Sequence, residues 1–150
     1  MNQEKIMKAK MVSAIILFII SLIAVLVFIG LYVDETHKTQ QTYREKYLIS
    51  IGEARDEINT WLEKQTDYDL HYNMVLSEMG SARTTVFLIN DFTDEQKAIN
   101  ELHYCFVKYP EQMKSKLEDT YTALKDIADN LDKGYDEARN IVETIDKKGM

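Results

Sequence analysis

A stretch of 22 residues without a charged side chain, 12–33 (VSAIILFIISLIAVLVFIGLYV), constrains this chain more than any other feature. As a helix it is roughly 33 Å long, at about 1.5 Å per residue, which is enough to cross a hydrocarbon core of about 30 Å. A buried core helix of this length would need a large fold around it, and the rest of the chain is too short and too polar. The stretch is therefore predicted to be a transmembrane helix in contact with the lipid bilayer.

A cleaved signal peptide is the main alternative to a transmembrane helix. Secretory apolar regions are shorter, about 7–15 residues, and end in small residues that suit the peptidase. Here the apolar run continues through Phe28, Ile29 and Leu31, and no such cleavage site follows it. An uncleaved signal anchor is the prediction.

The charges on the two sides of the stretch predict its orientation. Three lysines and one glutamate precede it, whereas 15 basic and 24 acidic residues follow it. Positive residues next to a span remain in the cytoplasm. Residues 1–11 are therefore predicted to be a cytoplasmic tail of a single-pass cell-membrane protein, with the rest of the chain extracytoplasmic. An acidic external domain lacks the basic surface that phosphate backbones need, so no nucleic-acid partner is expected.

The external part is predicted to be all-α. Residues 34–46 are polar and are interpreted as a juxtamembrane stalk, and 47–150 as a helical domain. Apolar residues recur there every seven positions, in the a/d pattern of helices packed along their length. In the first half, the two lines of this pattern are Ile51, Ile58, Gln65, Tyr72, Met79, Val86 and Ala54, Trp61, Tyr68, Val75, Ala82, Ile89. In the second half they are Leu117, Leu124, Leu131, Ala138, Ile145 and Thr120, Ile127, Gly134, Ile141.

Two arrangements of these helices fit the pattern. Thr93 and Gln96 resemble a capping box, so a helix should start near Asp94 after a turn near 91–92. The favoured arrangement is a long antiparallel helical hairpin with legs 34–89 and 94–148. The alternative is a compact four-helix bundle with breaks near residue 67 and at Pro110, where a helix could break or restart. The unbroken register across residue 67, with no Gly or Pro nearby, favours the hairpin.

The sequence offers little that could carry catalysis. No glycine-rich phosphate loop, nucleophile elbow or helical zinc motif is present. The histidines His37, His71 and His103 lie far apart, and Cys105 has the helical spacing of a buried apolar residue. The chain is predicted not to be an enzyme, with no catalytic residues, no metal site and no cofactor.

Two groups of residues are candidates for contact with a partner or ligand. The apolar segment around the predicted turn contains Phe87, Leu88 and Phe92, which is more than one face can bury. Aromatic residues that include Tyr72 and Tyr104, together with His103, could line a pocket between helices, although large rings more often fill a core. Either group would serve recognition and not chemistry.

The predicted function is therefore that of a membrane-anchored extracytoplasmic interaction or scaffold protein of the cell envelope. It would bind a protein partner, or further copies of itself, through helix–helix contacts. The plan of an N-terminal span followed by external helices resembles that of the extracytoplasmic four-helix sensor domains of bacterial receptors. This resemblance implies the alternative, a ligand-sensing bundle that signals through a separate membrane partner.

Overall fold

The computed structural model describes residues 2–147 and confirms the all-α prediction, since these residues form helices and turns and no strand. The helices are α1 (Asn2–Lys64), α2 (Tyr68–Val86), α3 (Thr93–Lys108), α4 (Pro110–Lys114), α5 (Leu117–Asp129) and α6 (Tyr135–Thr144). The chain divides into two compact units, Met1–Thr39 and Gln40–Met150.

The first unit lies within α1 and contains the apolar stretch 12–33. Every large apolar side chain of this stretch is exposed, among them Phe18 at 70% and Phe28 at 72%. A core helix would bury such side chains, so residues 12–33 are not part of a core formed by the described chain. Among the described residues it is the one helix long and apolar enough to cross a membrane.

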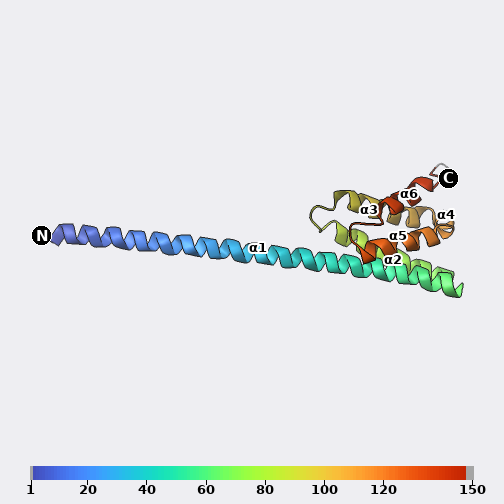
Figure 1. The fold of residues 1–150 in the computed structure, drawn as a ribbon, viewed down its shortest axis with the longest axis horizontal. Helices are drawn as coiled ribbons and strands as arrows, with labels where there is room; N and C mark the ends of the chain where they lie inside the picture. The colour runs from blue at the N-terminus through green and yellow to red at the C-terminus, as the bar shows by residue number, and fades with distance from the viewer. Residues whose placement is uncertain (1, 148–150) are drawn as a thin grey trace. The chain divides into compact units, whose positions relative to one another are not determined.

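The second unit is a helical bundle, which we call the bundle, and in it residues 40–64 of α1 are followed by α2 to α6 (Figure 1). α2 and α3 pair across the turn 87–92, α3 also packs on α6, and α6 packs on α5. Trp61 of α1 meets Tyr68 of α2 edge-on, with 5.3 Å between the ring centroids. Nδ1 of His71 on α2 lies within hydrogen-bond distance, 2.7 Å, of Oε2 of Glu57 on α1.

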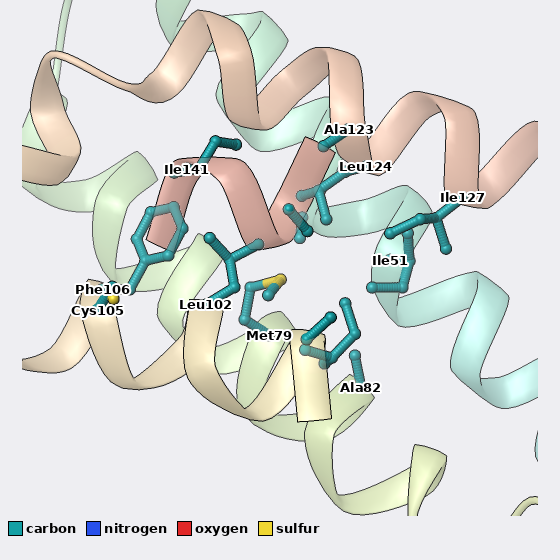
Figure 2. Close-up of a cluster of buried hydrophobic side chains, with 14 of the residues drawn as sticks. Ile51, Met79, Ala82, Leu102, Cys105, Phe106, Ala123, Leu124, Ile127 and Ile141 are labelled. Carbon is teal, nitrogen blue, oxygen red and sulfur yellow. The ribbon is translucent and has the colours of Figure 1, made fainter. Parts of the chain in front are cut away.

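Most positions of the predicted seven-residue pattern are buried in the core of the bundle, to which α3 adds residues outside the pattern such as Leu102. Figure 2 shows Ile51, Met79, Leu102, Leu124 and Ile141 converging from five different helices. All but Ile141, which is 5% exposed, are fully buried. Burying apolar surface stabilises a fold by about 25 cal/mol per Å², so these side chains hold the helices together.

The predicted unbroken hairpin leg is corrected by a turn at residues 65–67. α1 ends at Lys64 and α2 starts at Tyr68, so the compact bundle, which required a break near residue 67, describes the packing. Gln65 and Asp67 both have a φ of 54°, in the left-handed region. The turn forms without Gly or Pro. The seven-residue pattern continues in the same register on both sides of it, which is why the pattern had suggested a continuous helix.

A further turn at 130–134 gives the bundle five long helices instead of four. It ends at Gly134, whose φ is 83°. A Cβ at this position would lie 2.4 Å from the backbone oxygen of Ala123 and 2.8 Å from a side-chain carbon of Ile127. Only glycine fits here, because both the backbone conformation and the space exclude a side chain.

The turn predicted before α3 is present, but its predicted capping box is not. Phe92 takes the N-cap position, and no side-chain hydrogen bond caps the helix. Gln96 instead donates from Nε2 to the carbonyl oxygens of Val86, at 3.1 Å, and Ile89, at 3.2 Å. At the other end of α3, Pro110 starts α4, as the restart alternative predicted.

Candidate interaction surface

The outward face of α3 carries two exposed large side chains, Tyr104 and Val107, beside two half-buried ones, Asn100 and His103. Asn100, His103, Tyr104 and Val107 occupy positions i, i+3, i+4 and i+7, which places them on one side of the helix. Tyr104 is 48% exposed and Val107 is 53% exposed. We call this set the α3 face.

A groove of about 500 Å³ surrounds the α3 face. Its lining comes from α2, α3, α6 and the segment after α6: Arg83, Asn100, Glu101, His103, Tyr104, Cys105, Val107, Val142 and Lys147. Two cationic side chains, Arg83 and Lys147, lie in this lining against one carboxylate, Glu101. The groove is thus locally basic, although the sequence after the apolar stretch is acidic.

His103 is held beside the backbone of α2. Its Nε2 lies 3.5 Å from where a Cβ on Gly80 would be, so the missing side chain at Gly80 makes room for the ring. Burial, and then the Arg83 guanidinium, lower the pKa of His103 below its ordinary value. The imidazole is therefore neutral at pH 7 and can donate or accept a hydrogen bond.

The predicted contact residue Tyr72 lies in the core and not at the groove. It is 8% exposed, and its hydroxyl donates to the carbonyl oxygen of Phe106 at 2.8 Å. Its ring belongs to a chain of aromatic rings that runs from Trp61 through Tyr68 and Tyr72 to Phe106, with centroids 5.3 to 5.5 Å apart. This part of the aromatic cluster fills the interior, and Tyr104 is its member on the surface.

The apolar segment around the 87–92 turn is likewise divided between core and surface. Phe92 is 7% exposed and packs with the core, and Arg44 lies over its ring at 5.2 Å from the centroid. Phe87 and Leu88 are 55% and 49% exposed. The structure thus places Phe87 and Leu88 at one end of α2, and His103 and Tyr104 on the α3 face.

Three titratable side chains that the sequence analysis considered lie in different environments: Cys105, His71 and His103. Cys105 is fully buried, as its spacing predicted, and burial raises the pKa of its thiol. His71 is engaged with Glu57 on α1, whereas His103 faces Gly80 on α2. Within residues 2–147, no three His, Cys, Asp or Glu side chains are arranged to hold a metal ion. The geometry of the groove suits recognition.

Sequence reasoning missed most of the groove. Arg83, Asn100, Val107 and Lys147 were not candidates, because their positions converge only after α2, α3 and α6 are packed. The spacing of Asn100, Tyr104 and Val107 was a usable signal, since it marks a second stripe opposite the core stripe of the same helix.

Comparison of the chain with protein-family models, curated proteins and solved structures finds no match.

Proposed function

We propose that this chain is a membrane-anchored interaction protein of the cell envelope, whose bundle binds a protein partner through the α3 face. The observation that carries the proposal is the exposed pair Tyr104 and Val107 beside a groove of about 500 Å³. Aromatic and apolar side chains at the centre of a patch, with charges around them, are typical of protein interfaces. In this proposal the chain is not an enzyme and needs no cofactor.

The anchor and its orientation are part of the proposal. The exposed apolar stretch 12–33 would be covered by lipid, and the lysines before it would hold the N-terminus in the cytoplasm. The bundle would then lie on the extracytoplasmic side. A single-pass anchor of this kind keeps the α3 face available to other envelope proteins.

The partner we propose is an amphipathic helix with acidic residues beside its apolar stripe. Tyr104 and Val107 would pack against the stripe, while Arg83 and Lys147 would attract the acidic residues. A second copy of this chain fits less well, because 24 acidic and 15 basic residues follow the apolar stretch and like-charged bundles repel each other.

Site-specific photocrosslinking in membranes tests the proposal. A benzophenone amino acid in place of Tyr104 should give a crosslinked product with another protein, and the same probe at the exposed Lys125 on α5 should not. Mass spectrometry of the product identifies the partner. Crosslinking only to a second copy of the chain would contradict the heteromeric proposal, and equal crosslinking at both positions would contradict the proposed surface.

A ligand-sensing bundle is the second candidate, favoured by the neutral His103 and by the size of the groove. The two functions differ in which substitution matters. If a protein binds, Val107→Asp should abolish co-purification of the partner while His103→Ala preserves it. If a small ligand binds, His103→Ala should be the more damaging change.

A further inference from the structure

We propose that the turn 87–92 is a second membrane-contact site, in which Phe87 and Leu88 enter the interfacial layer of the lipid bilayer. This inference rests on the proposed anchor but not on the proposed partner. It assigns a lipid surface to two side chains that neither the core nor the α3 face uses.

The exposure of side chains alternates sharply around the turn. Val86 is fully buried, Ile89 is 2% exposed and Phe92 is 7% exposed, so these three belong to the core. Phe87 and Leu88, between them in sequence, are about half exposed. Two adjacent large apolar side chains on a hydrogen-bonded turn are well suited to insert into a lipid interface.

The turn is held in place by hydrogen bonds to residues on either side. Gln40 on α1 uses both ends of its amide: Nε2 donates to the carbonyl oxygen of Leu88 at 3.1 Å, and Oε1 accepts from the backbone N–H of Asn90 at 2.9 Å. Gln96 holds the inner side of the turn through the carbonyl oxygens of Val86 and Ile89. The turn is thereby tied to the first residue of the bundle.

The chain length from Gln40 to the apolar stretch limits how far the turn can be from lipid. Seven residue steps separate position 33 from Gln40. They span about 10 Å as a helix and at most about 25 Å fully extended. The polar layer on each side of the hydrocarbon core is about 5–8 Å thick. The anchor thus keeps Phe87 and Leu88 at a high effective concentration near the interface.

The charges around the turn indicate which lipids it would meet. Asp91, Asp94 and Glu95 follow the exposed pair in sequence, and Arg44 lies over Phe92. Acidic residues repel anionic headgroups, so the contact of Phe87 and Leu88 with the membrane should not require anionic lipids. Zwitterionic phosphatidylcholine is the appropriate test surface.

Tryptophan fluorescence of the full chain in phosphatidylcholine vesicles tests the inference. Trp61 is the only tryptophan, so Trp61→Phe gives a silent background, provided that its thermal unfolding matches the wild type. If it does not, Trp61 is retained and its signal subtracted. In either background, the tryptophan fluorescence of the Phe87→Trp variant should be blue-shifted, and brominated phosphatidylcholine should quench it at least twofold. The matched control Leu70→Trp, 58% exposed at the other end of α2, should be quenched by less than a tenth.

A third variant, Phe18→Trp within the apolar stretch, reports on the anchor itself. Quenching at position 18 without quenching at position 87 would overturn the lipid contact and leave the anchor standing. A blue shift at position 87 without quenching would indicate a protein contact and would also overturn the inference. Absence of quenching at both positions would overturn the anchor and the lipid contact together.

Discussion

Tyr47 and Tyr135 show how single residues fix the start of the bundle. Their hydroxyl groups lie 3.0 Å apart inside the core, and each side chain is less than 5% exposed. Each hydroxyl satisfies the other, so α1 and α6 are joined by a polar contact that neither could bury alone. Burial contributes most to raising the pKa of both phenols, and it keeps them protonated in the folded state.

Removing both members of this pair should cost less than the sum of the two single removals. Tyr135→Phe leaves the Tyr47 hydroxyl buried without a partner, so we expect the free energy of unfolding to fall by about 1–3 kcal/mol. The double variant Tyr47→Phe/Tyr135→Phe should lose less than the sum of the two single changes. Urea unfolding of the full chain in detergent measures all four proteins, and strictly additive losses would contradict a paired role.

The same pair predicts a pH dependence at high pH. The unfolded phenols release protons from about pH 10, whereas the folded ones, with raised pKa values, retain them. Their stabilisation is therefore complete below about pH 10 and is lost as the pH rises above it. The wild type should lose more stability between pH 9 and pH 11 than the double phenylalanine variant. Equal losses would show that other groups dominate this range.

At the scale of the helices, most positions of the seven-residue pattern are buried as predicted, but the pattern did not predict where the chain turns. Ile51, Met79 and Leu124 are in the core as predicted. The turn at 65–67, which the bundle alternative required, has no Gly or Pro to mark it, because Gln65 and Asp67 take the left-handed conformations that glycine usually supplies. Gly134 itself was a sequence signal for the turn that it ends. The seven-residue pattern instead counted Gly134 as a core position, and it is indeed buried. The contacts within the groove could not be predicted without knowing these turns.

Gln65→Gly distinguishes the turn from a continuous helix. Glycine relieves a left-handed conformation that costs other residues about 1–2 kcal/mol, although it also makes the unfolded chain freer. We therefore expect the free energy of unfolding to stay the same or rise by up to about 1 kcal/mol. A continuous helix at this position would instead lose about 1 kcal/mol. Chemical unfolding by urea decides between the two signs.

Gly134→Ala should destabilise the bundle more than any other glycine-to-alanine change. The added Cβ meets the Ala123 carbonyl oxygen at 2.4 Å in a left-handed backbone, so a loss of at least about 2 kcal/mol is expected. Gly52→Ala is the matched control. Gly52 lies within α1, and its added Cβ would meet only the end of the Arg55 side chain at 3.9 Å, so we expect a gain of about 0.5–1 kcal/mol. Similar effects of the two changes would contradict the described turn.

At the scale of the whole molecule, the chain combines an exposed apolar helix with a domain that has its own core. The stretch 12–33 has no covering in the described chain, whereas the seven-residue pattern of the bundle is buried internally. The length and composition of the stretch make it a candidate membrane span. Because the side chains of 12–33 are exposed while those of the seven-residue pattern are buried, the core of the bundle forms without this stretch.

The distribution of charge predicts which side of the membrane the bundle occupies. Three lysines lie before the span, so residue 5 should be cytoplasmic and residue 125 extracytoplasmic. The test uses a Cys105→Ala background, with Lys125→Cys on the exposed side of α5 or Lys5→Cys near the N-terminus. A membrane-impermeant maleimide should label the cysteine at position 125 in intact spheroplasts. It should label the cysteine at position 5 only after the membrane is permeabilised. The opposite pattern would reverse the orientation and place the α3 face in the cytoplasm, where the acidic domain would meet a different set of partners.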